Sequence, residues 1–281
     1  NISIATNNLS ERLISQFQPR TTDVAKRELR KIIKGMWEKY KSYDMRELIE
    51  AIDSSEINDK TKYPLMSWLD ELDDMGLFTK TNSPTIEDLA KEGQLTVLDL
   101  SDFTQINKKQ IIVNYFANKL FNARRAGKIP PFVLIVEEAH QFAPEQEDRS
   151  RAISRNVIET IAREGRKFNA CLVLVSQRPV QLSTTALSQC NSNIILRVSN
   201  PYDLQHIGKS CEGVDDDILK QLPQLKVGEA LITGEAVNHP LLVRVRERVS
   251  KKSEKGIRLD DELIKFHITK EISNKDLETF M

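Results

Sequence analysis

Residues 132–140 read FVLIVEEAH, and this stretch decides the fold class. Consecutive apolar residues followed by two acids are typical of a parallel β-strand that is buried on both faces. In open α/β sheets, ligands bind beyond the C-terminal ends of such strands. Successive strand side chains point to opposite faces, so Glu137 and Glu138 are expected to differ in role. One carboxylate suits hydrated Mg²⁺ and the other suits activation of a water molecule. The alternative is a strand that merely ends in polar residues.

Short apolar runs alternate with helical patterns on both sides of this stretch, from about residue 93 to 245. This alternation predicts an α/β domain with a mainly parallel sheet whose strands are covered on both faces. Only a short stretch containing Gly234 separates the last two runs, so they are expected to form an antiparallel hairpin at the sheet edge. Strands are expected at 95–100, 132–136, 171–176, 194–198, 230–232 and 241–245, and helices at 108–125 and 151–166.

The regions flanking this α/β domain have different patterns. Residues 1–92 carry apolar side chains at helical spacing and predict a helical subdomain, whose last helix is expected to end at Gly76. Residues 246–281 are rich in charge and predict a tail that is either solvated or braces a neighbouring subunit. Helices are expected at 24–40, 44–52 and 62–72 in the subdomain, and at 260–266 and 274–280 in the tail.

A second signal is IAREGRKFN, residues 161–169, which closes the predicted helix 151–166. Arg163 and Arg166 are i,i+3 neighbours, so they are expected to project from nearly the same side of the helix end. One interpretation is that both guanidinium groups stabilise the helix carbonyls electrostatically. The other is that they offer a planar cation to a phosphate, which arginine can bind with two parallel hydrogen bonds.

A third signal is LVLVSQRP, residues 172–179, another apolar strand that ends in polar residues and is stopped by a proline. This strand is expected to lie next to the one that carries the two glutamates. Gln177 would then be placed to contact a γ-phosphate or the water that attacks it. Taken alone, the SQRP segment fits an ordinary transition from strand to loop equally well.

In this order and spacing, the three segments resemble the HerA/FtsK superfamily of hexameric DNA-pumping ATPases, and within it the archaeal HerA helicases. Residues 135–140 look like the Walker B element of that family, followed by the arginine-bearing segment 163–166 and by SQRP at 176–179. The resemblance covers residues 93–245 well, residues 1–92 moderately and the tail weakly. One departure is Glu137, which stands where P-loop ATPases commonly have aspartate.

The resemblance implies a RecA-like fold, the second half of a P-loop ATPase core, that works with ATP and Mg²⁺. Carried onto this sequence, it makes Glu138 the catalytic base, Glu137 the Mg²⁺ support and Gln177 the sensor of the γ-phosphate. Arg163 becomes an arginine finger that acts on the nucleotide of the adjacent subunit, with Arg166 as the second candidate. The resemblance further implies a homo-hexamer, DNA as the substrate, a NurA-type nuclease as partner and a role in resecting double-strand breaks in archaea.

The sequence does not contain the phosphate-binding motif G-x-x-x-x-G-K-[ST] that this class needs. Its only Gly-Lys-Ser lies at 208–210, where Asp203 stands five residues before Gly208 in place of a glycine. Residues 202–207 read as the start of a helix and not as a glycine-rich loop. We therefore expect this chain to be the C-terminal part of a longer protein, and by itself to bind ATP weakly without turning it over.

Two loops at the predicted ligand edge are candidates for DNA contact. One is Glu145–Arg151, with Arg149 and Arg151, and the other begins at Gln181. Basic side chains in such loops hold phosphate groups without reading the base sequence. The alternative for each loop is an ordinary solvated turn.

Composition narrows the possible classes of protein. Lys+Arg and Asp+Glu both number 41, which excludes a basic nucleic-acid coat protein but not a local DNA-binding surface. No apolar run approaches the length needed to span a bilayer, so no membrane association is expected. Three cysteines without a C-x-x-C pair indicate a reducing, cytoplasmic compartment.

Other interpretations compete with the HerA-type helicase. An FtsK-type or conjugation-type DNA pump would use the same core with a different partner. A non-catalytic oligomerisation or nuclease-docking module would use the fold as a scaffold. A metal-dependent hydrolase built on Glu137 and Glu138 is a weaker alternative, because no second acidic or histidine cluster completes a two-metal site.

Overall fold

The computed structural model describes residues 2–17, 22–145, 152–251 and 263–264. The chain forms two compact units, Asn1–Val243 and Arg244–Met281. The architecture given below is that of the first unit. The tail helices predicted at 260–266 and 274–280 lie outside the described residues, apart from residues 263–264, which are helical. No described helix combines the length and the apolar composition needed to cross a bilayer.

The N-terminal region is helical, as predicted. α3 begins at a capping box, in which Asp44 and Glu47 exchange hydrogen bonds between side chain and backbone. Gly76, with φ of +61°, turns the chain just after α4. The helices of this region are α1 Glu11–Phe17, α2 Asp23–Lys39, α3 Met45–Asp53, α4 Asp59–Asp73 and α5 Ile86–Leu89.

The core of these helices extends to α6, Ile106–Arg125. Ile111 and Tyr115 of α6 are buried in the same apolar cluster as Leu29 of α2 and Leu48 of α3. Full burial of a large apolar side chain contributes roughly 1.5–3 kcal/mol, so this shared cluster ties α6 firmly to the helical region. Because apolar packing continues across it, the domain boundary predicted near residue 92 stays a prediction.

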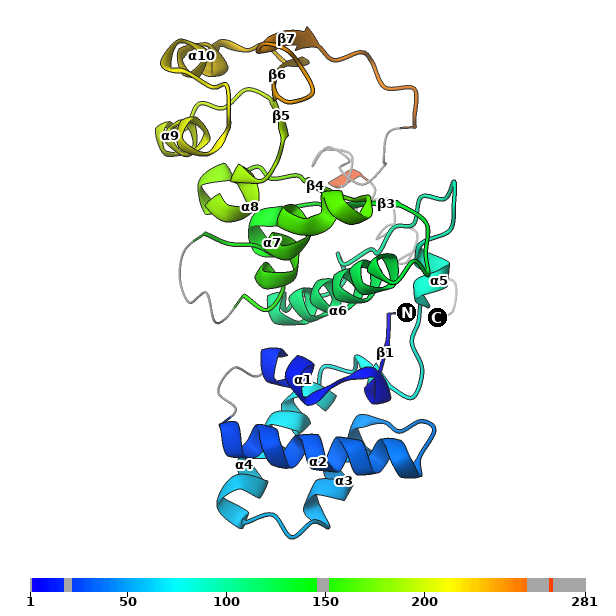
Figure 1. Ribbon diagram of the computed structural model, residues 1–281. Helices are drawn as coiled ribbons and strands as arrows, with labels where there is room; N and C mark the ends of the chain where they lie inside the picture. The colour runs from blue at the N-terminus through cyan, green and yellow to red at the C-terminus, as the bar shows by residue number, and fades with distance from the viewer. Residues whose placement is uncertain (1, 18–21, 146–151, 252–262, 265–281) are drawn as a thin grey trace, which may run out of the picture. The chain divides into compact units, whose positions relative to one another are not determined.

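The two strands predicted to carry the site are formed and adjacent. β3, Phe132–Val136, pairs in parallel with β4, Ala170–Leu174, and Val136 lies opposite Leu174. Both strands therefore end at the same edge of the sheet. α6 and α7, Arg155–Glu164, pack against one face of this pair (Figure 1).

The opposite face of the β3–β4 pair is open in the described part of the chain, so the prediction of strands buried on both faces is wrong there. Val133 and Ile135 are 59% and 52% exposed, and Val173 and Val175 are 38% and 39% exposed. Alternate side chains point to opposite faces, and the described helices cover only one of them. Consecutive apolar residues predict that both faces of a strand are buried, but they do not specify which element covers each face.

A second sheet follows in the chain. β5, Ser192–Ile195, is antiparallel to β6, Glu229–Gly234, and β7, Leu241–Arg244, lies beside β6. The last two predicted strands are thus neighbours. The strand predicted at 95–100 is wrong, since these residues pair with no described strand. The remaining elements are β1 Ile4–Ala5, β2 Phe78–Thr79, α8 Thr184–Ser188, α9 Pro201–Ser210 and α10 Asp216–Gln221.

Candidate functional site

The two glutamates follow β3 directly, where the chain bulges out of the sheet. The Val175 N–H donates to the Val136 carbonyl at 3.0 Å, and the Ala139 N–H donates to the Val175 carbonyl at 2.9 Å. Glu137 and Glu138 therefore lie opposite a single residue, Val175, where a regular parallel ladder has one residue, so the bulge contains one extra residue. Since both lie outside the strand, strand alternation does not decide their orientation. Glu137 is exposed, whereas Glu138 is partly buried.

Glu138 adopts the left-handed backbone conformation, with φ of +49° and ψ of +45°. This conformation is unusual for a residue with a side chain and costs on the order of 1 kcal/mol or more. Among the described residues other than glycine, only Asn169 shares a positive φ. Such strained positions gather at functional sites, because the surrounding structure must hold them in place.

The carboxylate of Glu138 has a neighbour at each oxygen. Oε1 accepts a hydrogen bond of 2.8 Å from Gln177 Nε2, which follows β4. Oε2 lies 3.4 Å from His140 Nδ1, and the same ring nitrogen is 3.0 Å from Ser176 Oγ. The structure thus brings together Glu138 and Gln177, as their positions after adjacent strands led us to expect. It also fixes the orientation of the carboxylate.

His140 and Ser176 were not predicted as site residues, although both lie within the quoted segments. The spacing of His140 and Ser176 along the chain does not indicate that they form a hydrogen bond with each other. Their contact depends on the register of β3 against β4, which aligns the polar residues following the two strands. A signal was present in the sequence, since each apolar run is followed by a polar side chain that needs a hydrogen-bond partner.

α7 positions the first of the two arginines. Arg163 is exposed, and its Nη1 lies 3.8 Å from Oε2 of Glu159 one helical turn earlier. The α-helix ends one residue after Arg163, and Gly165 opens the 3₁₀ turn Gly165–Phe168. A Cβ on Gly165 would lie 2.3 Å from the Ala170 carbonyl oxygen, so this packing against β4 requires glycine.

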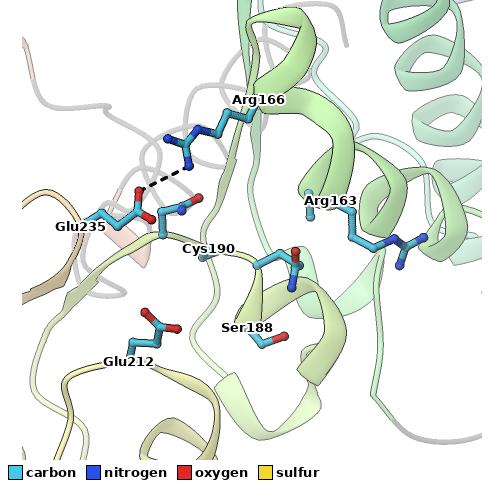
Figure 2. Close-up of a pocket in the computed structure, with 9 residues that line it drawn as sticks. Arg163, Arg166, Ser188, Cys190, Glu212 and Glu235 are labelled. Carbon is cyan, nitrogen blue, oxygen red and sulfur yellow. Dashed lines mark ion pairs between the residues drawn. The ribbon is translucent and has the colours of Figure 1, made fainter.

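Arg163 and Arg166 point apart, contrary to the prediction that they share one side of the helix (Figure 2). Nη1 of Arg166 lies 3.8 Å from Oε2 of Glu235, just after β6, whereas Arg163 is near Glu159 on its own helix. Spacing of three residues brings the two backbone positions near one face, but each long side chain turns toward its own carboxylate, Arg163 toward Glu159 and Arg166 toward Glu235.

A polar pocket of about 220 Å³ lies beside these arginines (Figure 2). Its lining includes Arg163, Arg166, Cys190, Glu212 and Glu235. Burial raises the pKa of the Cys190 thiol, so this side chain stays neutral at pH 7. Neither of the paired residues after β3 and β4 lines the pocket, which is therefore distinct from the carboxylate site.

The predicted DNA contacts are only partly described. Arg149 and Arg151 lie outside the described residues. Gln181 is exposed in the turn Pro179–Gln181, and its carbonyl accepts a 2.8 Å hydrogen bond from the Glu145 N–H. This bond joins the loop after β3 to the loop after β4.

The Gly-Lys-Ser sequence at 208–210 lies in the last turn of α9. A phosphate-binding loop precedes a helix and presents free N–H groups to the ligand. Here the sequence lies at the opposite end of the helix, and the Ser210 side chain is buried. The expectation that residues 202–207 are helical is confirmed, and this segment has none of the geometry of a phosphate-binding loop.

Solved structures identify the class of fold. VirB4 of Thermoanaerobacter pseudethanolicus matches with a TM-score of 0.65 and 17% sequence identity, over 85% of this chain and 68% of that protein. The bacterial conjugative coupling protein TrwB matches with a TM-score of 0.58 and 13% identity, over 90% of this chain and 71% of that protein. The chain has the RecA-like α/β fold of these ATPases.

No known family model matches the sequence, but curated proteins do. A probable helicase of Methanocaldococcus jannaschii is 32% identical over 238 residues, which make up 77% of this chain and 45% of that protein. The DNA double-strand break repair helicase HerA of Saccharolobus solfataricus is 30% identical over 210 residues, 72% of this chain and 41% of that protein. The chain is thus a homologue of archaeal HerA helicases, and it spans less than half the length of these relatives.

Proposed function

We propose that this chain is the part of a HerA-type DNA translocase or helicase that carries the water-activating side of its ATPase site. The observation that carries the proposal is the hydrogen bond between Glu138 and Gln177 at the common end of two parallel strands. Ligands bind at that edge in open α/β sheets. Relatives named HerA support DNA as the substrate, and a TrwB structure solved with a non-hydrolysable ATP analogue supports ATP as the nucleotide.

The side chains at the end of β3 suit the two acidic roles of a phosphoryl-transfer site. Glu138, oriented by Gln177 and His140, accepts the proton of the attacking water, and Gln177 also faces the γ-phosphate. Glu137 is exposed and fits hydrated Mg²⁺, which needs only one or two protein carboxylates beside phosphate oxygens and waters. When bound, Mg²⁺ neutralises charge that develops on the transferred phosphoryl group.

Arg163 is the proposed arginine finger, and it serves the nucleotide of a neighbouring subunit in a hexameric ring. Its guanidinium is exposed on α7, so a neighbouring subunit can reach it. A finger supplied by the neighbour makes hydrolysis depend on assembly. Arg166 remains the second candidate, although its ion pair with Glu235 engages it within its own chain.

The proposed substrate is DNA, and the proposed partner is a NurA-type nuclease that acts with the ring in the cytoplasm to resect double-strand breaks. Arg149, Arg151 and Gln181 are the proposed DNA contacts. Contacts of this kind bind the phosphate backbone, so the affinity for DNA falls steeply as salt is raised.

The phosphate-binding loop is proposed to lie outside this chain, so the test uses the full-length protein. We expect DNA-stimulated ATP hydrolysis by the full-length protein and none by this chain alone. Lys209→Ala is expected to change turnover by less than about twofold, because an exposed substitution at a helix end away from the site has a small effect. Phosphate release, measured with and without duplex DNA, checks both points. A full-length protein without ATPase activity, or turnover by this chain that Lys209→Ala abolishes, would contradict the proposal.

His140 offers a milder test of the same site. His140→Ala in the full-length protein is expected to lower kcat about tenfold with little change in KM for ATP, because the loss of one polar neighbour frees the Glu138 carboxylate. His140→Asn retains a hydrogen-bonding side chain and is expected to lose less. His239→Ala, at an exposed histidine after β6, is the matched control and should behave like the parent. Steady-state kinetics that show no loss in His140→Ala would exclude this orienting role.

A further inference from the structure

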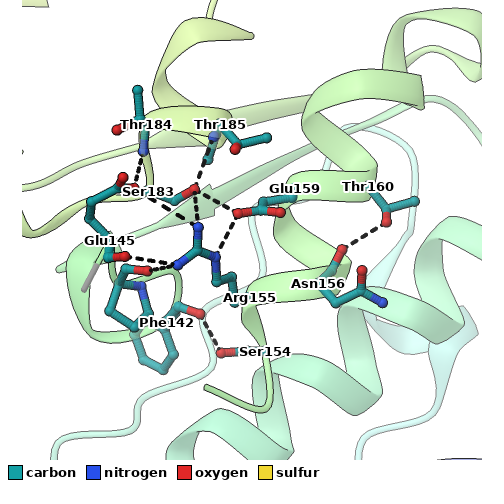
Figure 3. Close-up of polar contacts among 12 residues, drawn as sticks. Phe142, Glu145, Ser154, Arg155, Asn156, Glu159, Thr160, Ser183, Thr184 and Thr185 are labelled. Atoms are coloured by element: carbon teal, nitrogen blue, oxygen red, sulfur yellow. Dashed lines mark hydrogen bonds and ion pairs between the residues drawn. The ribbon is translucent and has the colours of Figure 1, made fainter. Parts of the chain in front are cut away.

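Arg155, in the first turn of α7, is a buried cation outside the proposed ATPase machinery. It is 6% exposed, whereas arginine is almost never fully buried unless its charge is paired. Its Nε donates to Glu159 Oε1 at 2.7 Å, one helical turn further along α7. The rest of its guanidinium reaches two loops that follow the strands of the site (Figure 3).

The first of these loops follows Glu138 and β3. Nη1 of Arg155 donates to the carbonyl of Pro144 and, at 3.2 Å, to the carbonyl of Glu145. Its Nη2 lies 3.9 Å from the Glu145 carboxylate. Burial raises the pKa of Glu145, but hydrogen bonds from Thr184 and the charge of Arg155 outweigh burial and hold that pKa below its ordinary value. Glu145 is therefore ionised at pH 7, and the pair is a charged one.

The second loop follows Gln177 and β4. Ser183 Oγ lies 3.4 Å from Arg155 Nη2 and donates to Glu159 Oε1 at 2.7 Å. The two loops also bind each other directly, since the Ser183 N–H donates to the Ala143 carbonyl at 2.7 Å. Arg155 thus contacts both the loop that follows Glu138 and the loop that follows Gln177.

Glu159 connects this cluster to the proposed finger. One carboxylate oxygen binds Arg155 and Ser183, and the other lies 3.8 Å from Arg163 Nη1. Arg155, Glu159 and Arg163 are spaced at i, i+4 and i+8, so they form a row along one face of α7. Arg166 lies beyond the end of α7 and pairs elsewhere, with Glu235, so the row ends at Arg163.

We propose that Arg155 is a positioning residue that couples the loops after Glu138 and Gln177 to the orientation of Arg163 through Glu159. This inference rests on the proposed function and adds to it. A displacement of either loop changes the hydrogen bonds of Arg155, and α7 passes that change to Arg163 over two turns. The state of one ATP site would in this way set how its own subunit presents a finger to the next site.

A double-mutant cycle in the full-length protein tests this coupling. Arg155→Met keeps the length of the side chain but removes its hydrogen bonds. We expect kcat to fall by about tenfold to a hundredfold, as a group misplaced by about 1 Å can cause, with KM for ATP within about threefold. In the Arg163→Ala background the same change should lower kcat by less than about twofold, because the residue through which it acts is already absent. Arg155→Lys restores the charge near Glu159 and should recover part of kcat.

Arg124 provides the matched control. It is a partly buried arginine on α6 that donates hydrogen bonds to the backbone carbonyls of Phe168 and Ile129 at 2.6 and 2.9 Å. Neither of these hydrogen bonds involves Glu159. Arg124→Met is expected to lower the thermal stability. Its effect on kcat should be the same with and without Arg163.

The outcomes separate the coupling from the function on which it rests. The kcat losses of Arg155→Met and Arg163→Ala would multiply in the double variant if the two residues acted independently, as we expect for the Arg124 control. That result would overturn the positioning role and leave the ATPase proposal standing. ATP turnover that survives Glu138→Gln would overturn the proposed function itself and the coupling with it. Where Arg155→Met does not fold, Glu159→Gln poses the same question, because it removes the charge that both arginines share. Glu159→Gln must then lower kcat in the otherwise unchanged protein and change kcat by less than about twofold in the Arg163→Ala background.

Discussion

Glu138→Gln in the full-length protein is expected to lower ATP turnover by about 10²–10⁴-fold, the range typical for a lost general base. Glutamine has nearly the same shape, so it can still lie between Gln177 and His140, but it cannot take a proton from water. Phosphate release under saturating ATP measures the loss. ATP affinity, followed by binding of a fluorescent analogue, and assembly, followed by light scattering, should stay near parental values.

The matched control is Glu50→Gln, which makes the same chemical change at an exposed position on α3. It should leave turnover, affinity and assembly unchanged. Turnover that persists in Glu138→Gln with an intact assembly would contradict the catalytic role. That result would favour the scaffold interpretation, in which the fold serves oligomerisation or nuclease docking.

Arg163→Ala is expected to lower turnover by about 10³–10⁵-fold, the effect of removing an arginine finger in related phosphoryl-transfer enzymes. The finger is proposed to serve a neighbouring subunit, so the loss should be repaired by mixing. Arg163→Ala subunits keep Glu138, and Glu138→Gln subunits keep Arg163. A random equal mixture in a ring of heterologous interfaces should regain about a quarter of its active sites. Each variant alone should remain inactive.

The mixing experiment separates three possibilities. A finger that acts within its own chain gives no recovery, because no subunit in the mixture carries both groups. Arg166→Ala, tested in the same way, distinguishes the second candidate. Its ion pair with Glu235 leads us to expect a much smaller loss of turnover. A deep loss in Arg166→Ala with near-normal turnover in Arg163→Ala would exchange the roles of the two arginines.

Local sequence pattern was sufficient for most elements of the fold. α2 follows from apolar residues at helical spacing, and β3 and β4 follow from apolar runs of strand length. Tertiary context decided the rest. Residues 95–100 have a strand-like pattern but belong to no strand in the described part of the chain, and a strand forms only beside a neighbouring strand. The open face of β3 and β4 was mispredicted for a similar reason, since composition does not say which covering element is present.

The candidate site was predictable where it depends on chain order and unpredictable where it depends on close packing. Glu138 and Gln177 meet because adjacent parallel strands end at one edge. The divergence of Arg163 and Arg166 follows their separate ion pairs with Glu159 and Glu235, which no periodicity reveals. The burial of Arg155 could not be foreseen either. Its i,i+4 spacing to Glu159 is visible in the sequence, but such pairs usually lie on the surface.

The left-handed turn at Glu138 also bears on how this chain can evolve. At a φ of +49°, glycine or asparagine fits the backbone more readily than glutamate does. Selection for thermal stability and selection for the catalytic role proposed for Glu138 therefore favour different residues at this position. A duplicated copy released from hydrolysis would be expected to acquire glycine or asparagine at this position, and its fold would be more stable.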